Sequence, residues 1–359
     1  MAHVLGLDIG GANTKSCYLK MNKGIIQAAK GRSVYHEIWR NPEGLRDVLN
    51  GLKTVLKKTN LDGVALTMTA ELCDGFESKS QGVLYILGIV EDVFKDVPVY
   101  VWTTEGNFVL PEEIKNDPLQ AAAANWLASA SALAHCSIIE NPSILVDMGS
   151  TTTDILPVSP GKVHVKGKTD IERLQSGELL YTGVLRTAIN AILKEAYIDG
   201  VSCQVANEYF AISADVYRYL ELITDRDYDV PTPDGGEKGL EGCAKRLARV
   251  VASEPLELGA KNIFFMAKLI QEKQGEQIVN NILRLSSRKD IPQPSYLITT
   301  GQGSFILDEV ARRLGYKAIP WWRVIQGAKP HLAMASFAVS ALLAKELTGR
   351  IWTGDEKTI

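Results

Sequence analysis

The chain contains the same short pattern twice, and this repetition limits the folds available to it more than any other feature. Each copy is an apolar strand ending in aspartate, a turn of glycine and small polar residues, and a second apolar strand; the copies are residues 8–15 (DIGGANTK) and 147–154 (DMGSTTTD). The pattern predicts two β-hairpins whose turns leave backbone N–H groups free to surround an anion. One such hairpin is usually only a turn, but two in matching context indicate two related halves that share a phosphate site.

The residues of these hairpins are candidate ligands of a phosphate group and a metal ion. Asp8 and Asp147 stand at strand ends, where a carboxylate holds Mg²⁺ directly or through its water shell. A third glycine turn follows a later expected strand, at residues 296–299. The predicted phosphate-binding residues of the three turns are Gly10, Gly11, Asn13, Thr14, Lys15, Gly149, Ser150, Thr151, Thr152, Gly301 and Gly303.

Composition and charge exclude several classes of protein. The 359 residues suffice for two domains, and a net charge of −3 offers no electrostatic footprint for nucleic acid or an anionic membrane. The five cysteines lie far apart with no CxxC pair, which is typical of a reducing compartment. Because the sequence lacks a basic-then-apolar leader and an apolar run of membrane-spanning length, we expect a cytoplasmic protein with small-molecule substrates and no nucleic-acid or membrane partner. A homodimer stays open.

Hydrophobic periodicity predicts an α/β fold made of two ribonuclease-H-like domains around a cleft. Residues 1–136 form the first, with expected strands at 24–29, 64–68 and 98–102 and expected helices at 42–56, 77–94 and 119–136. Residues 137–329 form the second, with a strand at 163–165, an all-helical insertion over about 180–285, a strand at 296–299 and a helix at 304–314. A last helix between Pro330 and Gly349 is expected to cross back, so that residues 330–359 complete the first domain.

One loop interrupts the expected insertion. Residues 228–236 contain two prolines and two glycines, which stop a helix. We interpret this loop as a surface connection, with a lid over a ligand as the alternative.

Acidic residues follow the expected strand 64–68. Glu71 and Asp74 lie beyond its carboxyl end, where open α/β sheets bind their ligands. They are candidates for a general base or a metal ligand. The alternative is that they cap and solvate the next helix.

The segment 173–187 is dense in groups that bind polar ligands. Arg173 and Arg186 are a candidate pair of diphosphate clamps, because guanidinium groups bind phosphate oxygens in pairs. Glu178 is a further candidate base. The alternative is the start of an amphipathic helix with solvated charges.

Six phrases in order along the chain carry a family resemblance: LGLDIGGANTK, LTMTAELCDGF, AAAANWLASA, LVDMGSTTTDILPV, GELLYTGVLRT and TTGQGS. The hairpins resemble those of the actin, sugar-kinase and Hsp70 superfamily, in which two ribonuclease-H-like domains clamp a phosphorylated ligand and Mg²⁺. The combination of phrases resembles, more closely, the hydantoinase A/oxoprolinase-related proteins linked to tetrahydromethanopterin-dependent one-carbon metabolism in methanogenic archaea and some methylotrophic bacteria.

The resemblance implies a transferase of methanofuran biosynthesis. The phenol oxygen of γ-glutamyltyramine would displace the diphosphate of an aminomethyl-furanmethanol and form an ether. The turns would hold the leaving diphosphate, Mg²⁺ would lie at Asp8 and Asp147, and Glu71 or Glu178 would take the phenol proton. ATP would not be required, although nucleotide binding stays open. The alternatives are an ATP-dependent kinase or ATPase, a hydantoinase-type amide hydrolase and a non-catalytic scaffold switched by nucleotide.

Overall fold

The computed structural model of the chain describes residues 1–56, 59–136 and 140–350. Two six-stranded sheets organise these residues, and their five main strands have the same order. The first sheet runs β3-β2-β1-β4-β5-β6, and the second runs β10-β8-β7-β13-β14 with β9 paired to β8. The strands of the first sheet are β1 (Ala2–Ile9), β2 (Asn13–Asn22), β3 (Ile25–Tyr35), β4 (Gly63–Met68), β5 (Val99–Trp102) and β6 (Phe108–Val109). Those of the second are β7 (Ser143–Met148), β8 (Thr153–Ser159), β9 (Lys162–Val163), β10 (Leu179–Leu180), β13 (Tyr296–Thr300) and β14 (Lys317–Pro320).

Strand directions repeat as well as strand order. In each half the first strand pairs antiparallel with the second and parallel with a strand reached through a crossover, β4 in one sheet and β13 in the other. The predicted pair of related α/β halves is therefore confirmed, while the domain boundaries themselves stay predictions.

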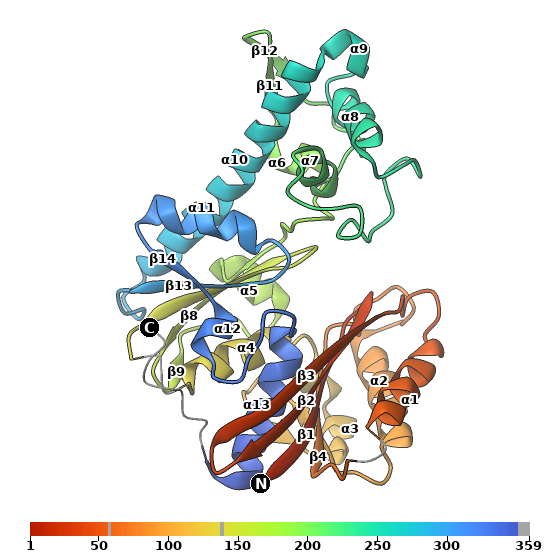
Figure 1. Cartoon of the computed structure of the whole chain (residues 1–359), viewed down its shortest axis with the longest axis vertical. Coiled ribbons are helices and arrows are strands. Elements are labelled where there is room, and N and C mark those ends of the chain that lie inside the picture. The colour runs from red at the N-terminus through yellow and green to blue at the C-terminus, as the bar shows by residue number, and fades with distance from the viewer. Residues whose placement is uncertain (57–58, 137–139, 351–359) are drawn as a thin grey trace.

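Helices cover both sheets. The bounds are α1 (Gly44–Val55), α2 (Lys79–Val93), α3 (Pro111–Asn116), α4 (Asn125–Ala134), α5 (Asp170–Ser176), α11 (Ser304–Leu314), α12 (Trp321–Val324) and α13 (Met334–Thr348), with a 3₁₀ turn, η1, at Pro118–Ala121. The outer helices α1 and α2 bury their apolar faces against the first sheet. Figure 1 shows α4 and α13 in the centre of the molecule, next to the first sheet.

One apolar cluster joins the two halves through α4 and α13. It contains Val4 of the first sheet, Leu145 of the second, Leu133 of α4 and Phe337 of α13. Helix α13 packs against β1, β2, β4 and α4, so the last predicted helix does cross back onto the first sheet. Gly6 of β1 allows this close approach, because a Cβ there would collide with backbone of α13.

The region between β10 and β13 is not all-helical, so that part of the prediction is wrong. It contains α6 (Ile189–Ile192), α7 (Ser213–Tyr219), α8 (Leu240–Arg249), α9 (Pro255–Leu258) and α10 (Ala260–Ser286), and also a hairpin of β11 (Glu195–Ile198) and β12 (Val201–Gln204). The hairpin turns at Asp199 and Gly200, whose φ angles of 50° and 83° are those of a tight turn that Asp-Gly favours. This dipeptide was the overlooked signal.

A second difference lies in the expected helix 119–136. The structure divides it into η1 and α4, and Ala123 between them has a φ of 49°. No helix can pass through a residue in this left-handed conformation. Helix α4 therefore begins at Asn125, whose side chain hydrogen-bonds to Asp8.

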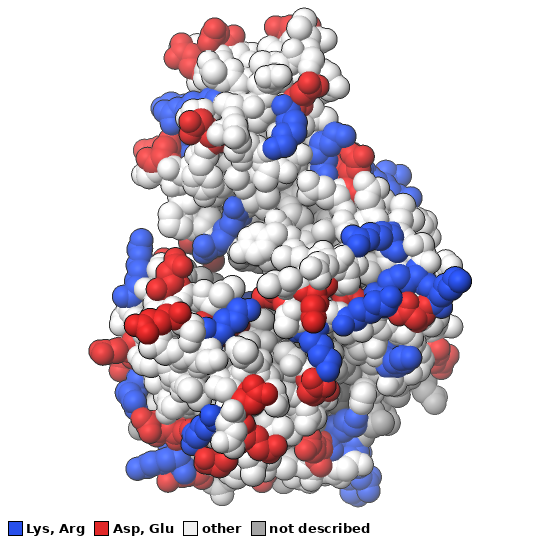
Figure 2. All heavy atoms as spheres, turned by 180° about the vertical axis from the view of Figure 1, so that it is seen from behind, with Lys and Arg blue, Asp and Glu red and all other residues white. Residues whose placement is uncertain are grey.

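The loop at residues 228–236 is packed onto the insertion. Tyr228 and Val230 are buried, and Asp234 accepts hydrogen bonds from Arg246 and Arg249 at 3.1 and 3.0 Å. Among the described residues no helix combines the length and the apolar character needed to cross a membrane. Basic and acidic side chains are mixed over the face shown in Figure 2.

Candidate functional site

The two repeated turns have the same hydrogen-bond geometry. The Gly10 N–H donates to the Asn13 carbonyl at 3.0 Å, and the Gly149 N–H donates to the Thr152 carbonyl at 2.9 Å. We call residues 10–13 turn 1 and residues 149–152 turn 2. The predicted hairpins are therefore present, and the halves of the molecule carry equivalent anion-sized turns.

Turn 1 is held between two segments of the first half. The N–H groups of His36 and Ile38 donate to the carbonyls of Ala12 and Gly11, both at 3.0 Å. On the other side, a Cβ at Gly11 would lie 2.7 Å from the Cys73 sulfur, so this position has no room for a side chain. Thr14 follows the turn and is buried, and no described residue forms a hydrogen bond with its hydroxyl.

Turn 2 rests on the segment that follows β10. The N–H groups of Val184 and Arg186 donate to the carbonyls of Gly149 and Ser150, both at 3.0 Å. A Cβ at Gly183 would lie 2.5 Å from backbone atoms of turn 2, which makes glycine necessary there. The importance of Gly183 was not predicted, although it lies inside the phrase GELLYTGVLRT that carried the resemblance.

Buried polar groups hold Gly183 in place. Its carbonyl accepts hydrogen bonds from Gln274 Nε2 and from Ser213 Oγ, both at 2.9 Å, and its N–H donates to Thr187 Oγ1 at 2.8 Å. Gln274 lies on α10 and Ser213 on α7. The helical part of the insertion therefore supports turn 2 from behind.

The third predicted turn lies against the end of β7, the strand that leads into turn 2. Gly301 has a φ of 89°, and a Cβ there would meet Asp147 Oδ1 at 2.5 Å. The Gly303 N–H donates to the Met148 carbonyl at 2.9 Å. Residues 301–303 therefore pack directly beside Asp147, and the structure brings the second and third predicted turns together.

Asp8 and Lys15 of the first half both act electrostatically on Asp147 of the second half. Burial raises the pKa of Asp8, and it raises the pKa of Asp147 to about 7 with smaller contributions from Asp154 and from Asp8 itself. The Lys15 ammonium opposes both shifts. Two strand-end carboxylates and one lysine thus share a single neighbourhood between the halves.

This neighbourhood fits a divalent cation. Asp8 is only 4% exposed; Lys15 and a hydrogen bond from Asn125 oppose the rise in its pKa, but its buried Oδ1 has no hydrogen-bond partner among the described residues and is left to a cation. In the part of the chain that the structure describes, no three His, Cys, Asp or Glu side chains are grouped as a metal cage. Mg²⁺ commonly takes one or two carboxylates and fills its other positions with water and substrate phosphates, and Asp8 with Asp147 matches that donor set.

Arg173 is not available as a diphosphate clamp. Its side chain is 2% exposed, forms an ion pair with Asp154 and lies 4.1 Å over the ring of Trp126 in α4. Asp154 is the strand partner of Asp147 in the β7–β8 register. Arg173 therefore connects the second hairpin to α4. The predicted role of Arg173 as a diphosphate clamp does not fit the structure, because its guanidinium already forms a buried ion pair with Asp154.

Glu178 is not brought into the site either. It is fully buried, and its carboxylate accepts hydrogen bonds from the N–H groups of Lys166 and Gly167 at 2.8 and 2.9 Å and from Arg288 at 2.6 Å. A carboxylate occupied on both oxygens by fixed donors has a structural role. These contacts favour a structural role for Glu178 over its predicted role as the base.

Glu71 has the opposite environment. It is 2% exposed, and within the described part of the chain its Oε2 has no hydrogen-bond partner. Burial raises its pKa from 4.5 to about 7, with Lys79 lowering and Asp170 raising the value. A carboxylate with a pKa near neutrality accepts and returns protons readily. Asp74, by contrast, is exposed beside Cys73, so Glu71 is the stronger of the two candidates.

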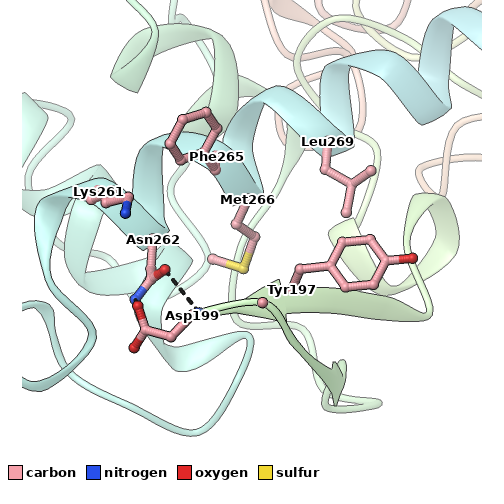
Figure 3. A pocket seen from close by; sticks show the side chains of 8 residues that line it. Tyr197, Asp199, Lys261, Asn262, Phe265, Met266 and Leu269 are labelled. Carbon is pink, nitrogen blue, oxygen red and sulfur yellow. Dashed lines mark hydrogen bonds between the residues drawn. The ribbon is translucent and has the colours of Figure 1, made fainter.

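A cavity of about 500 Å³ lies elsewhere, at the far end of the insertion (Figure 3). It is formed by the β11–β12 hairpin and the first turns of α10, and Asn262 closes one side through a 3.2 Å hydrogen bond to Asp199. None of the turn residues lines it. Its lining is Tyr197, Asp199, Gly200, Lys261, Asn262, Phe265, Met266 and Leu269.

The strand order and the paired turns define an actin-like ATPase fold, in which two sheets present equivalent loops to one site. Residues 62–342 match the model of the Hydantoinase/oxoprolinase family, and the chain belongs to that family. The predicted family resemblance is therefore confirmed.

Two curated relatives have the same name, (4-{4-[2-(γ-L-glutamylamino)ethyl]phenoxymethyl}furan-2-yl)methanamine synthase. The protein from Methanocaldococcus jannaschii is 36% identical over 344 residues, which cover 96% of this chain and 98% of that protein. The protein from Methanococcus vannielii is 33% identical over 216 residues, which cover 59% of this chain and 96% of that protein. This chain is thus a homologue of a named enzyme along nearly its whole length.

Solved structures support the fold. Acetone carboxylase in a nucleotide-free state has a TM-score of 0.54 at 9% identity, and the similarity covers 94% of this chain and 70% of that chain. The ROK hexokinase from Thermus thermophilus has a TM-score of 0.46 at 14% identity, with coverage of 97% and 99%. At such identities the acetone carboxylase likeness establishes the architecture, and nothing about substrates follows from it.

Proposed function

We propose that this protein is a transferase of methanofuran biosynthesis that joins γ-glutamyltyramine to an aminomethyl-furanmethanol diphosphate, forming an aryl-alkyl ether and releasing diphosphate. The observation that carries the proposal is the presence, in one site, of two anion-sized turns and two strand-end carboxylates, of which Asp8 is buried. The site belongs to a chain 36% identical, over nearly its whole length, to a protein named as the synthase of that ether product.

A diphosphate leaving group would explain why the site has two phosphate-sized turns. In the reaction, the bond between the furan methylene carbon and a diphosphate oxygen breaks, and a bond forms between that carbon and the phenol oxygen. Turns 1 and 2 would hold the departing diphosphate through backbone N–H groups and the hydroxyls of Ser150, Thr151 and Thr152, and Lys15 would balance part of its charge. Mg²⁺, when bound at Asp8 and Asp147, would neutralise the negative charge that grows on the diphosphate.

The furan makes strong nucleophilic assistance unnecessary. Its electron-rich ring spreads the positive charge that develops at the methylene carbon, so the protein must chiefly bind the diphosphate and keep water away. The burial of Asp8 and Glu71 is consistent with a site that excludes water.

Glu71 would take the phenol proton. Its pKa of about 7 leaves it ionised in a large fraction of molecules at neutral pH, and its unpaired Oε2 is free to accept a proton. It follows β4, whose last strand residue lies beside the end of β1 and therefore beside turn 1. A base at this position would receive the proton close to the diphosphate.

The deciding experiment measures diphosphate release by the purified protein given the furanmethanol diphosphate and Mg²⁺, with and without γ-glutamyltyramine. We expect release to depend on the phenol and to accompany an ether of the summed mass. ATP alone serves as the parallel substrate. Phosphate release from ATP, with no reaction of the furan compound, would replace this proposal by a kinase or ATPase function.

A further inference from the structure

Arg186 is a half-buried arginine whose guanidinium has no hydrogen-bond or ion-pair partner among the described residues. Its backbone is fixed, because its N–H donates to the Ser150 carbonyl in turn 2 at 3.0 Å. Because the backbone of Arg186 is fixed beside turn 2 and its guanidinium has no partner among the described residues, the guanidinium is available for a ligand.

The surroundings of Arg186 come from both halves of the molecule. Its charge acts on Tyr35 and Cys73 of the first half and on Tyr209 and Asp229 of the insertion. Tyr35 and Tyr209 are 52% and 57% exposed, so both rings present open faces. Arg186 therefore lies where the insertion and the first half approach each other.

The surroundings of Arg186 are next to the proposed diphosphate site. Cys73 packs against turn 1, and Tyr35 is the strand partner of Asn13, the last residue of that turn. Arg186 itself is bonded to turn 2. A molecule in contact with Arg186 would thus border both turns without filling them.

Asp229 supplies an anion near Arg186 without pairing to it. Asp229 is an exposed residue, although partial burial of its carboxyl group raises its pKa against the charges of Arg186 and Lys238, and no ion pair within 4.0 Å joins it to Arg186. The backbone around Asp229 is held, because Tyr228 is buried, donates its hydroxyl to Asp215 at 3.0 Å and accepts at its carbonyl from Lys238 at 2.6 Å. A cation and an anion kept near each other but apart complement a ligand that carries both charges.

We propose that Arg186 and Asp229 bind the α-amino-acid end of the acceptor, with the acceptor carboxylate on Arg186 and its ammonium on Asp229. This inference rests on the proposed function, since γ-glutamyltyramine carries a zwitterionic amino-acid group at the end remote from its phenol. Tyr35 and Tyr209 flank this subsite.

The nearby carboxylate also decides between the two roles open to Arg186. A diphosphate would be repelled by Asp229, whereas an ammonium group is attracted to it. The proposed diphosphate site has its own cations in Lys15 and the metal ion. The sequence-based role of Arg186 as a diphosphate clamp is therefore the rival that the experiment must separate.

The test compares two acceptors, γ-glutamyltyramine and N-acetyltyramine, which keeps the amide and lacks the amino-acid end. We expect the wild-type protein to prefer γ-glutamyltyramine. The variants Arg186→Met and Asp229→Asn should each lower kcat/KM for γ-glutamyltyramine by about tenfold or more, the loss expected for one charge-assisted contact, mainly through KM. Their kcat/KM for N-acetyltyramine and their KM for the furan diphosphate should stay within about twofold of wild type.

Arg226→Met is the matched control, because Arg226 is an exposed arginine of the same insertion. It should behave as wild type with both acceptors. Equal losses with the two acceptors, or a raised KM for the furan diphosphate, would overturn the inference and return Arg186 to the diphosphate.

The same experiments would give a different result if the proposed function itself were wrong. In that case the wild-type protein would form no ether with either acceptor, and the subsite would be judged by calorimetric binding of γ-glutamyltyramine. Weaker binding to Arg186→Met and Asp229→Asn than to Arg226→Met would support it. Unchanged or undetectable binding in all of these proteins would refute it.

Discussion

Replacing Glu71 by glutamine changes stability and catalysis in ways that depend on pH. Glutamine matches the protonated carboxyl group in shape, and it cannot ionise. In the folded protein, burial raises the pKa of Glu71 from 4.5 to about 7. A carboxyl group with a raised pKa disfavours folding once it is ionised, so the wild-type protein loses stability as the pH rises from about 4.5 to about 7 and is level above that.

The size of this effect follows from the shift. Each pKa unit corresponds to about 1.4 kcal/mol, so a shift of this size amounts to about 3 kcal/mol in the free energy of unfolding. Glu71→Gln should therefore match wild type at pH 4.5 and be more stable by up to about 3 kcal/mol at pH 8.5. Urea denaturation at a series of pH values measures the difference. Glu77→Gln, a change at an exposed position in the same connection, should show none.

The same Glu71→Gln change that raises the stability at neutral pH should lower the catalytic rate. General bases contribute about 10²–10⁴-fold, so kcat of Glu71→Gln should fall at least about 100-fold at pH 7.5. Wild-type kcat should rise with pH through about 7, following the ionisation of Glu71, and then level off. In the variant it should keep rising towards the pKa of the phenol, about 10, because only the acceptor's own ionisation remains.

Two results would refute this reasoning. A stability difference that stays constant from pH 4.5 to pH 8.5 would show that Glu71 does not titrate with a raised pKa. A variant with wild-type kcat and an unchanged pH profile would show that another group takes the proton.

The remaining predictions concern the rest of the site. Asp8→Asn and Asp147→Asn variants that still fold, as judged by circular dichroism, should lose Mg²⁺-dependent diphosphate release; normal release would exclude the metal assignment. Gly183→Ala should displace turn 2, where a Cβ would lie 2.5 Å from backbone atoms, and raise KM for the furan diphosphate about tenfold or more, whereas Gly88→Ala, which has open space around it, should leave KM unchanged. Glu178→Gln should lower the free energy of unfolding by about 3 kcal/mol, since it weakens a buried ion pair, while the pH profile of kcat keeps its shape; a shifted profile would mean that Glu178 takes part in the chemistry.

The repeated hairpins were predictable because they depend on local sequence. Strand, aspartate, glycine turn and strand follow one another within a few residues, and the second copy removed most of the ambiguity of the first. The β11–β12 hairpin depends on local sequence as well. It was missed because an Asp-Gly turn between two short strands was outweighed by the helical pattern around it.

The roles of the glutamates were not predictable in this way. Glu71 and Glu178 both follow or precede strands in phrases rich in polar residues, and nothing in the sequence shows which partners each finds. Arg288, 110 residues away in the sequence, donates a hydrogen bond to Glu178, whereas none of the residues that the structure describes forms a hydrogen bond with Oε2 of Glu71. Arg173 is a similar case, because its partner Asp154 and its stacking ring Trp126 lie in different halves of the chain.

The packing of α13 on β1, β2 and β4 has a consequence for the order in which the molecule is made. The first sheet leaves the ribosome early, yet one of its faces is covered by the last helix described, and Gly6 keeps that face open for it. Until α13 has been synthesised, this sheet presents uncovered apolar residues to the cell, and its folding cannot be completed as an independent unit. A nascent chain is therefore exposed to aggregation from the emergence of the first sheet until that of α13, and truncation before α13 removes the cover altogether.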